Sequence, residues 1–146
     1  GLGKSLCDQG KYWEGLREYD IVSYPGNLKT LLDDNIHSTL IFLVSHYDRL
    51  IRVQPDNARV YHSLGVLYSK LSDPQKAVTY YEKAISIDPD LKESIFNLAS
   101  TYEMLGESDQ AITLYQRVLS LKSGPDELDR LSASHLADMA RRIEKR

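Results

Sequence analysis

The side chains that could do chemistry in this 146-residue chain are few and scattered. No two of the four histidines lie three or four residues apart, so no single helix presents a two-histidine metal site. The one cysteine, Cys7, has only Lys4 nearby to favour a thiolate, and it cannot form an internal disulfide. We therefore expect no catalytic thiol, no metal site and no cofactor. The histidines are His37, His46, His62 and His135.

Two further patterns point away from catalysis. The segment Gly1-Leu2-Gly3-Lys4-Ser5 has the residue types of a phosphate-binding loop, but it lacks the upstream glycine spacing and a preceding strand. The acidic runs Asp33-Asp34 and Asp88-Pro89-Asp90 fit helix ends better than calcium sites. The sequence predicts a protein that is not an enzyme.

Composition narrows the class of partner. A formal charge of −3 and a pI near 5.8 argue against a nucleic-acid partner, which usually needs a basic face. No apolar run approaches the roughly twenty residues that span a bilayer, so we expect no membrane insertion. The single cysteine and the lack of a signal-peptide pattern favour a cytoplasmic location. Because the repeat pattern begins inside a helix, we expect this chain to be a fragment of a longer protein.

Residues 58–125 repeat one pattern with a spacing of 34 residues. In each copy, apolar residues at steps of three and four predict two amphipathic helices. In the first copy Asp73 and Pro74 can start the second helix, and Asp88-Pro89-Asp90 ends it. We expect Gly65 and Ala77 to face each other across this hairpin. The recurring pairs are Leu64 and Leu98, Tyr68 and Tyr102, Leu71 and Leu105, Ala77 and Ala111, and Tyr81 and Tyr115.

These positions resemble the tetratricopeptide repeat family. Its pattern is filled in the first copy by Tyr61, Leu64-Gly65, Tyr68, Ala77, Tyr81, Ala84 and Pro89, and in the second by Ile95, Leu98-Ala99, Tyr102, Ala111, Tyr115 and Val118. The resemblance implies an all-α fold, a right-handed α-solenoid of antiparallel helix hairpins. Such units stack on their neighbours and leave a concave surface, which in this family is lined by the first helix of each hairpin.

The same pattern divides the chain into five parts of one structural domain. Residues 1–23 are a truncated degenerate repeat, and 24–57 are an irregular degenerate repeat with a short first helix near 27–32 and a second at 37–53. Residues 58–91 and 92–125 are full repeats. Residues 126–146 are amphipathic and predict a C-terminal capping helix.

The resemblance implies that a partner protein or peptide binds in the concave groove. Asn97 stands where the family often carries an asparagine that bonds a peptide backbone, and Phe96 beside it would offer apolar contact. The alternative is that Asn97 is an ordinary surface residue and Phe96 packs on the next repeat. The predicted partner-binding residues are Arg59, His62, Val66, Glu93, Phe96, Asn97, Ser100, Met104 and Arg130.

One ligand class looks excluded by charge. Some members of the family bind chaperone C-terminal tails through a clamp of lysine, asparagine and arginine, and only Asn97 matches it here. His62, Val66, Glu127 and Leu131 stand at the other clamp positions, and Glu93 and Glu127 would repel an acidic tail. We therefore expect a chaperone tail not to bind.

The sequence thus predicts a protein–protein interaction module or scaffold without catalysis of its own. Two alternatives stay open: an ancillary domain of a larger enzyme or complex, and a module that self-associates through an open N-terminal edge near Leu2, Leu6, Tyr12 and Trp13, making it a homo-oligomer.

Overall fold

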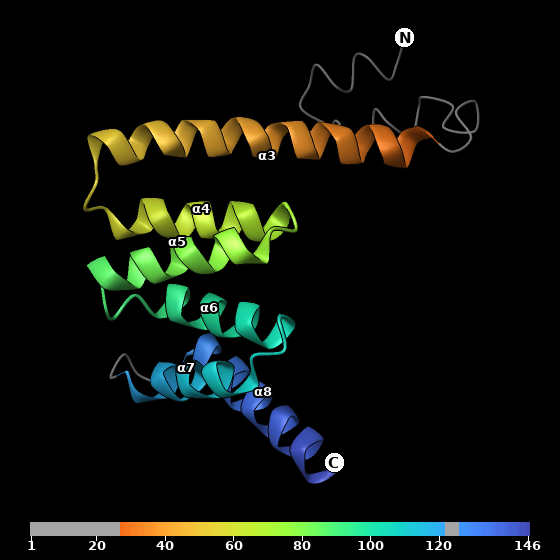
Figure 1. The fold of residues 1–146 in the computed structure, drawn as a ribbon, viewed down its shortest axis with the longest axis vertical. Coiled ribbons are helices and arrows are strands. Elements are labelled where there is room, and N and C mark those ends of the chain that lie inside the picture. The colour runs from red at the N-terminus through yellow and green to blue at the C-terminus, as the bar shows by residue number, and fades with distance from the viewer. Residues whose placement is uncertain (1–26, 122–125) are drawn as a thin grey trace. The chain divides into compact units, whose positions relative to one another are not determined.

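The computed structural model describes residues 27–121 and 126–146, and the described part is all helical. The chain divides into two units, residues 1–39 and 40–146. Within residues 40–146, helices α4 and α5 form one antiparallel hairpin and α6 and α7 form the next, with α8 packed on the second (Figure 1). The all-α repeat fold expected from the 34-residue pattern is confirmed. The helices are α3 (Asn27–Val53), α4 (Ala58–Lys70), α5 (Pro74–Ile87), α6 (Lys92–Met104), α7 (Ser108–Ser120) and α8 (Glu127–Glu144).

Helix α3 differs from what the sequence predicted. We expected a short helix near 27–32 and a separate one at 37–53, but Asn27–Val53 is one continuous helix of 27 residues. The acidic pair Asp33-Asp34 lies inside it and does not end it. No glycine or proline interrupts this segment, and aspartate alone is only mildly unfavourable in a helix interior. The division of the chain into repeats upstream of residue 58 stays a prediction.

Each hairpin turns through one residue in the left-handed region. Ser72 has φ 59° in the first turn and Gly106, at the equivalent place 34 residues later, has φ 81° in the second. Glycine adopts this conformation without the steric cost that a Cβ adds. The next helix then starts as expected, because the Asp73 side chain accepts a hydrogen bond from the Lys76 backbone N–H and Pro74 occupies the first turn.

The core consists of small residues set between large ones. In the first hairpin a Cβ on Gly65 would lie 2.5 Å from two ring carbons of Tyr81, so the closest neighbour of Gly65 is this ring rather than Ala77. In the second hairpin the equivalent residues are Ala99 and Tyr115, both fully buried. The tyrosine ring therefore fills the space that a small residue on the first helix leaves open.

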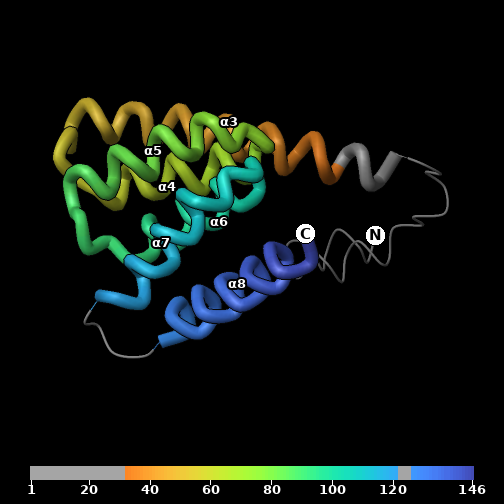
Figure 2. The backbone as a smooth tube through the Cα atoms, turned by 60° about the horizontal axis from the view of Figure 1, so that its bottom comes forward, coloured from red at the N-terminus to blue at the C-terminus, as the bar shows by residue number. Residues whose placement is uncertain are grey.

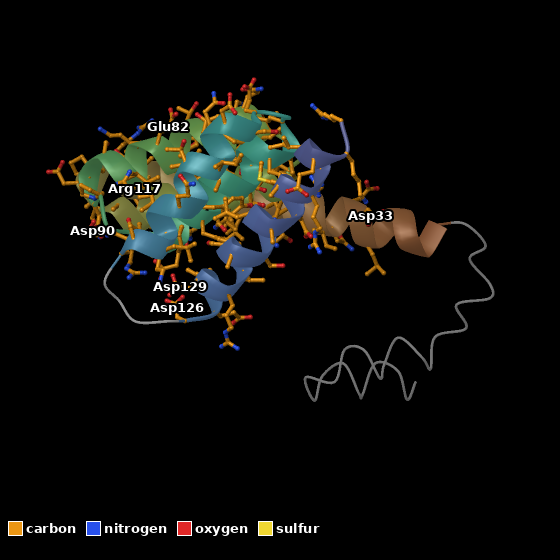
Figure 3. The ribbon with its side chains drawn as sticks, turned by 90° about the horizontal axis from the view of Figure 1, so that it is seen from below. Asp33, Glu82, Asp90, Arg117, Asp126 and Asp129 are labelled. Atoms are coloured by element: carbon orange, nitrogen blue, oxygen red, sulfur yellow. The ribbon has the colours of Figure 1, made fainter. Side chains whose placement is uncertain are left out.

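Helix α8 closes the C-terminal end as the sequence predicted. Asp126 caps it, accepting a hydrogen bond from the Asp129 backbone N–H while the Asp129 carboxylate accepts one from the Asp126 N–H. Lys92, at the start of α6, lies 3.0 Å from Asp126 and 2.8 Å from Asp129 and is almost fully buried. Both aspartates lie together at the first turn of α8 (Figure 3), and α8 runs beside α6 and α7 (Figure 2).

Candidate peptide-binding groove

A small hollow of about 190 Å³ lies between the first helices of the two hairpins, α4 and α6. Four of the predicted partner-binding residues meet there, although they come from two repeats that are separated in the sequence. They line the hollow with two polar residues, a lysine and a buried tyrosine. The predicted members are Val66, Asn97, Ser100 and Met104, and the others are Ser69, Lys70, Tyr81 and Thr101.

The hollow combines apolar contact with hydrogen-bonding groups. Met104 is 66 % exposed and offers its thioether side chain to solvent. Asn97 is half-buried, and its side chain bonds that of Tyr81. Burial raises the pKa of Tyr81 to about 12, and the bond to Asn97 opposes that rise. The hydroxyl is therefore neutral at physiological pH, and it fixes the orientation of the Asn97 amide. Lys70 is exposed at the end of α4 and supplies a positive charge.

Three other predicted residues lie toward the start of α4 and α6. Arg59 and Glu93 are exposed and line a second hollow of about 490 Å³. His62 lies between the two helices, with its Nδ1 2.8 Å from the Ser94 hydroxyl and its ring 5.8 Å from the Tyr81 ring. Burial lowers the pKa of His62, and the carboxylate of Glu93 partly offsets that effect. Neutral histidine is thus the form that fits this contact.

The last two predicted residues lie elsewhere. Phe96 is half-buried, with its ring edge-on to Tyr115 at 5.7 Å and to His135 at 6.0 Å, as the packing alternative describes. Arg130 is exposed on α8 and lines neither hollow described above. The role of all nine residues in partner binding stays a prediction.

The sequence reasoning missed a polar cluster around Glu103, which joins α6, α7 and α8. The Tyr115 hydroxyl donates to Glu103 Oε2 at 3.0 Å, His135 Nδ1 lies 2.8 Å from the same oxygen, and Arg142 bonds Oε1 at 3.3 Å. His135 also stacks on the Tyr115 ring at 5.0 Å. Each residue was visible in the sequence, but no local spacing indicates that residues 32 and 39 positions apart meet.

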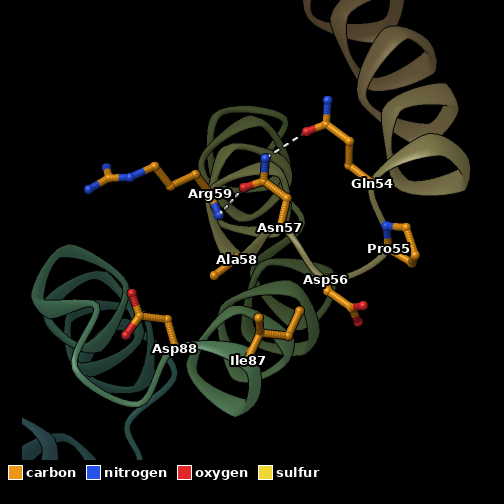
Figure 4. A pocket seen from close by; sticks show the side chains of 8 residues that line it. All are labelled: Gln54, Pro55, Asp56, Asn57, Ala58, Arg59, Ile87 and Asp88. Atoms are coloured by element: carbon orange, nitrogen blue, oxygen red, sulfur yellow. Dashed lines mark hydrogen bonds between the residues drawn. The ribbon is translucent and has the colours of Figure 1, made fainter.

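A further hollow of about 600 Å³ lies where the loop before α4 meets the end of α5 (Figure 4). The Asn57 side chain caps α4 by accepting from the Arg59 backbone N–H, and it donates to the Gln54 side chain at 2.7 Å. These bonds account for the amide groups at this place through helix capping. The hollow is lined by Gln54, Pro55, Asp56, Asn57, Ala58, Arg59, Ile87 and Asp88.

Within residues 27–121 and 126–146, no cluster of three histidine, cysteine or acidic side chains could hold a metal ion. In the same residues, no helix is long and apolar enough to cross a membrane. Cys7, the Gly1–Ser5 segment and the predicted N-terminal edge lie outside the described residues.

Solved structures with the same arrangement of helices are tetratricopeptide domains. The first tetratricopeptide domain of Spaghetti (RPAP3), bound to the HSP90 peptide SRMEEVD, is 15 % identical to this chain, with a TM-score of 0.61 over 98 % of this chain and 90 % of that one. The second such domain of human RPAP3, in complex with the HSP70 peptide SGPTIEEVD, is 16 % identical, with a TM-score of 0.58 over 95 % of this chain and 89 % of that one. No curated protein sequence matches the chain.

These two structures contradict one expectation from the sequence. We expected a chaperone tail not to bind, because only Asn97 matches the clamp of the family. Both domains, which are only 15 % and 16 % identical to this chain, carry chaperone peptides that end in EEVD. Mismatches read from a few side chains are thus no ground for excluding this ligand class, and the expectation was wrong.

Two sequence models of the tetratricopeptide repeat match the chain, one over residues 58–91 and the other over residues 80–113. The first coincides with the α4–α5 hairpin, and the second joins α5 to α6. Together they cover the helices that line the groove and its buried tyrosines. Through these repeats, the chain belongs to the tetratricopeptide repeat family.

Proposed function

We propose that this chain is a protein–protein interaction module that binds an extended peptide in the hollow between α4 and α6, with no catalysis of its own. The observation that carries the proposal is the meeting of Lys70, Asn97 and Met104 in one hollow, drawn from two successive repeats. An ammonium, an amide and an exposed apolar side chain are together suited to a peptide with one anchor residue and a carboxylate.

The amide of Asn97 is held ready for such a ligand. Its bond to the Tyr81 hydroxyl uses part of its hydrogen-bonding capacity, and an amide has both donor and acceptor groups to spare. A side chain whose orientation is already fixed loses little entropy on binding. Asn97 can therefore bond a peptide backbone or a terminal carboxylate without rearranging.

The charge around the hollow decides which peptides fit best. Lys70 lines the hollow, and no acidic residue does, whereas Glu93 lies in the second hollow at the start of α6. An acidic C-terminal segment would place its carboxylate near Lys70 and Asn97 and away from Glu93. The peptides SRMEEVD and SGPTIEEVD, which the two similar domains bind, have this chemistry and are the natural probes.

The test is fluorescence anisotropy with labelled SRMEEVD and SGPTIEEVD against the wild-type chain and two variants. Lys70→Ala removes an exposed charge, and Asn97→Ala removes the amide. Hydrogen bonds to a charged group are worth about 1.5–3 kcal/mol, so each variant should weaken binding about tenfold or more. The same peptides with an amidated C-terminus should also bind more weakly if the carboxylate is recognised.

Gln110→Ala is the matched control, because it removes an exposed amide on α7. Circular dichroism melts of all variants show whether Asn97→Ala has disturbed the Tyr81 core. If Lys70→Ala and Asn97→Ala bind the peptides as tightly as Gln110→Ala does, the peptide site is not this hollow. If the wild-type chain binds neither peptide, an acidic C-terminal tail is not its ligand.

A further inference from the structure

Helix α3 exposes more apolar surface than any other described helix. From Leu32 to Val53 it has no buried residue, whereas each of α4 to α8 contributes at least two. Phe42 is 65 % exposed, Val53 is 77 % exposed and Ile41 is 49 % exposed. A row of large apolar side chains left in water marks an interaction surface.

The exposed residues follow one side of the helix. Val53 comes about three full turns after Phe42, so the two lie nearly in line on α3, and Ile41 lies beside Phe42. Charged residues border this line: Asp34 and Arg52 are about five turns apart and therefore share the same side. Because all of these residues stand on one unbroken helix, their spacing follows from helix geometry alone.

The charges on this side are arranged with opposite signs about Phe42. Asp34 precedes Phe42 by roughly 12 Å along the helix axis, while Arg49 and Arg52 follow it by roughly 10 and 15 Å, at 1.5 Å per residue. Among the described residues, neither Asp34 nor Arg52 has an ion-pair partner. The Arg49 Nε bonds the Ser45 carbonyl along the same helix, which leaves its other nitrogens available.

We propose that α3 pairs with α3 of a second copy of this chain, in antiparallel orientation about a twofold axis at Phe42. Such an axis brings Phe42 against Phe42 of the other copy and places Asp34 of each copy beside Arg49 and Arg52 of the other. A twofold interface must be complementary to itself, and this surface is, in both apolar contact and charge. The surface consists of Asp34, Ile41, Phe42, Arg49, Arg52 and Val53.

The antiparallel register makes a prediction that no other occupant of this surface shares. Asp34→Arg gives a chain with two like charges where the partner also presents arginine, and Arg52→Asp gives the reverse. Each variant alone should be shifted toward monomer, because like charges in contact are unfavourable. An equimolar mixture should form a mixed dimer, because every contact between the two variants then joins opposite charges.

Sedimentation velocity over a hundredfold concentration range measures these states for the whole chain. The wild type should show a concentration-dependent dimer, and Phe42→Asp should abolish it without lowering the melting temperature. Ile143→Asp is the matched control, since Ile143 is 57 % exposed on α8, and it should leave the dimer intact. The mixture of Asp34→Arg and Arg52→Asp should restore the dimer that neither forms alone.

Three results would overturn the proposal. A wild type that stays monomeric at all concentrations would mean that no second copy binds α3. A monomer that Phe42→Asp destabilises would mean that residues 1–26 of the same chain cover the surface. A dimer that survives Phe42→Asp, or a mixture that stays monomeric, would place the contact elsewhere or in another register.

Discussion

The substitution Gly65→Ala tests the packing of the first hairpin most directly. The added Cβ would lie 2.5 Å from Cδ1 and Cε1 of Tyr81 and 2.9 Å from Cζ, closer than carbon atoms pack without displacement. The Tyr81 side chain is only 2 % exposed, so its ring has no free space into which to move. The new methyl group must therefore push apart the two helices of the hairpin.

Two effects of opposite sign set the magnitude. Overpacking a close contact of this kind costs about 1–3 kcal/mol. Alanine is favoured over glycine within a helix by about 1 kcal/mol, which acts in the opposite direction. We expect a net loss of about 1 kcal/mol in the free energy of unfolding, and a larger loss for Gly65→Leu.

The assay is urea denaturation followed by circular dichroism at 222 nm, in the wild-type and Tyr81→Leu backgrounds. Tyr81→Leu is itself destabilising, but it removes the ring that the new methyl group would meet. In that background Gly65→Ala should change sign and stabilise the chain by about 1 kcal/mol, the helix-propensity gain alone. If Gly65→Ala has the same effect in both backgrounds, the Tyr81 ring is not what requires glycine, and the reasoning fails.

Two further predictions concern the first turn and the capping helix. Ser72→Gly should raise the free energy of unfolding by about 1 kcal/mol, because Ser72 holds a left-handed φ of 59°, and Gly106→Ala should lower it by a similar amount. Urea midpoints would measure both, and a destabilising Ser72→Gly would contradict this reading. The bond from the Asp129 backbone N–H, followed by the bond from Lys92, holds the pKa of Asp126 below its usual 3.8, so this carboxylate stabilises the fold fully above that pH and less as the pH falls through its lowered pKa. Asp126→Asn should therefore melt at a lower temperature than the wild type at neutral pH, with a difference that shrinks in acid; a difference independent of pH would rule out the carboxylate as its source.

The repeated part of the fold was predictable from the sequence because its signals are local. Apolar residues at steps of three and four fixed both helices of each hairpin, and Asp73 with Pro74 marked the start of α5. Asn97 and Val66 were placed in one groove for the same reason, since the 34-residue spacing carries one helix onto the next. These inferences needed only the helical period and the repeat length.

What the sequence could not supply were contacts whose partners have no common spacing. The Glu103 cluster depends on the angle at which α8 crosses the second hairpin, which side-chain periodicity does not determine. Helix α3 was misjudged because Asp33-Asp34 was given the weight of a helix end, without the glycine or proline that usually stops a helix. The contact of Gly65 with Tyr81, in place of Ala77, depends on the rotamer of a ring, which sequence does not reveal.

The bonds that hold the hairpins together have a consequence for how the chain folds. Between described side chains, the longest listed span is that from Arg142 to Glu103, 39 residues, and the link from Lys92 to Asp126 spans 34. Proteins whose contacts join residues this near in sequence have low contact order and fold fast. Each hairpin can therefore form as soon as the following helix has left the ribosome, without waiting for the end of synthesis.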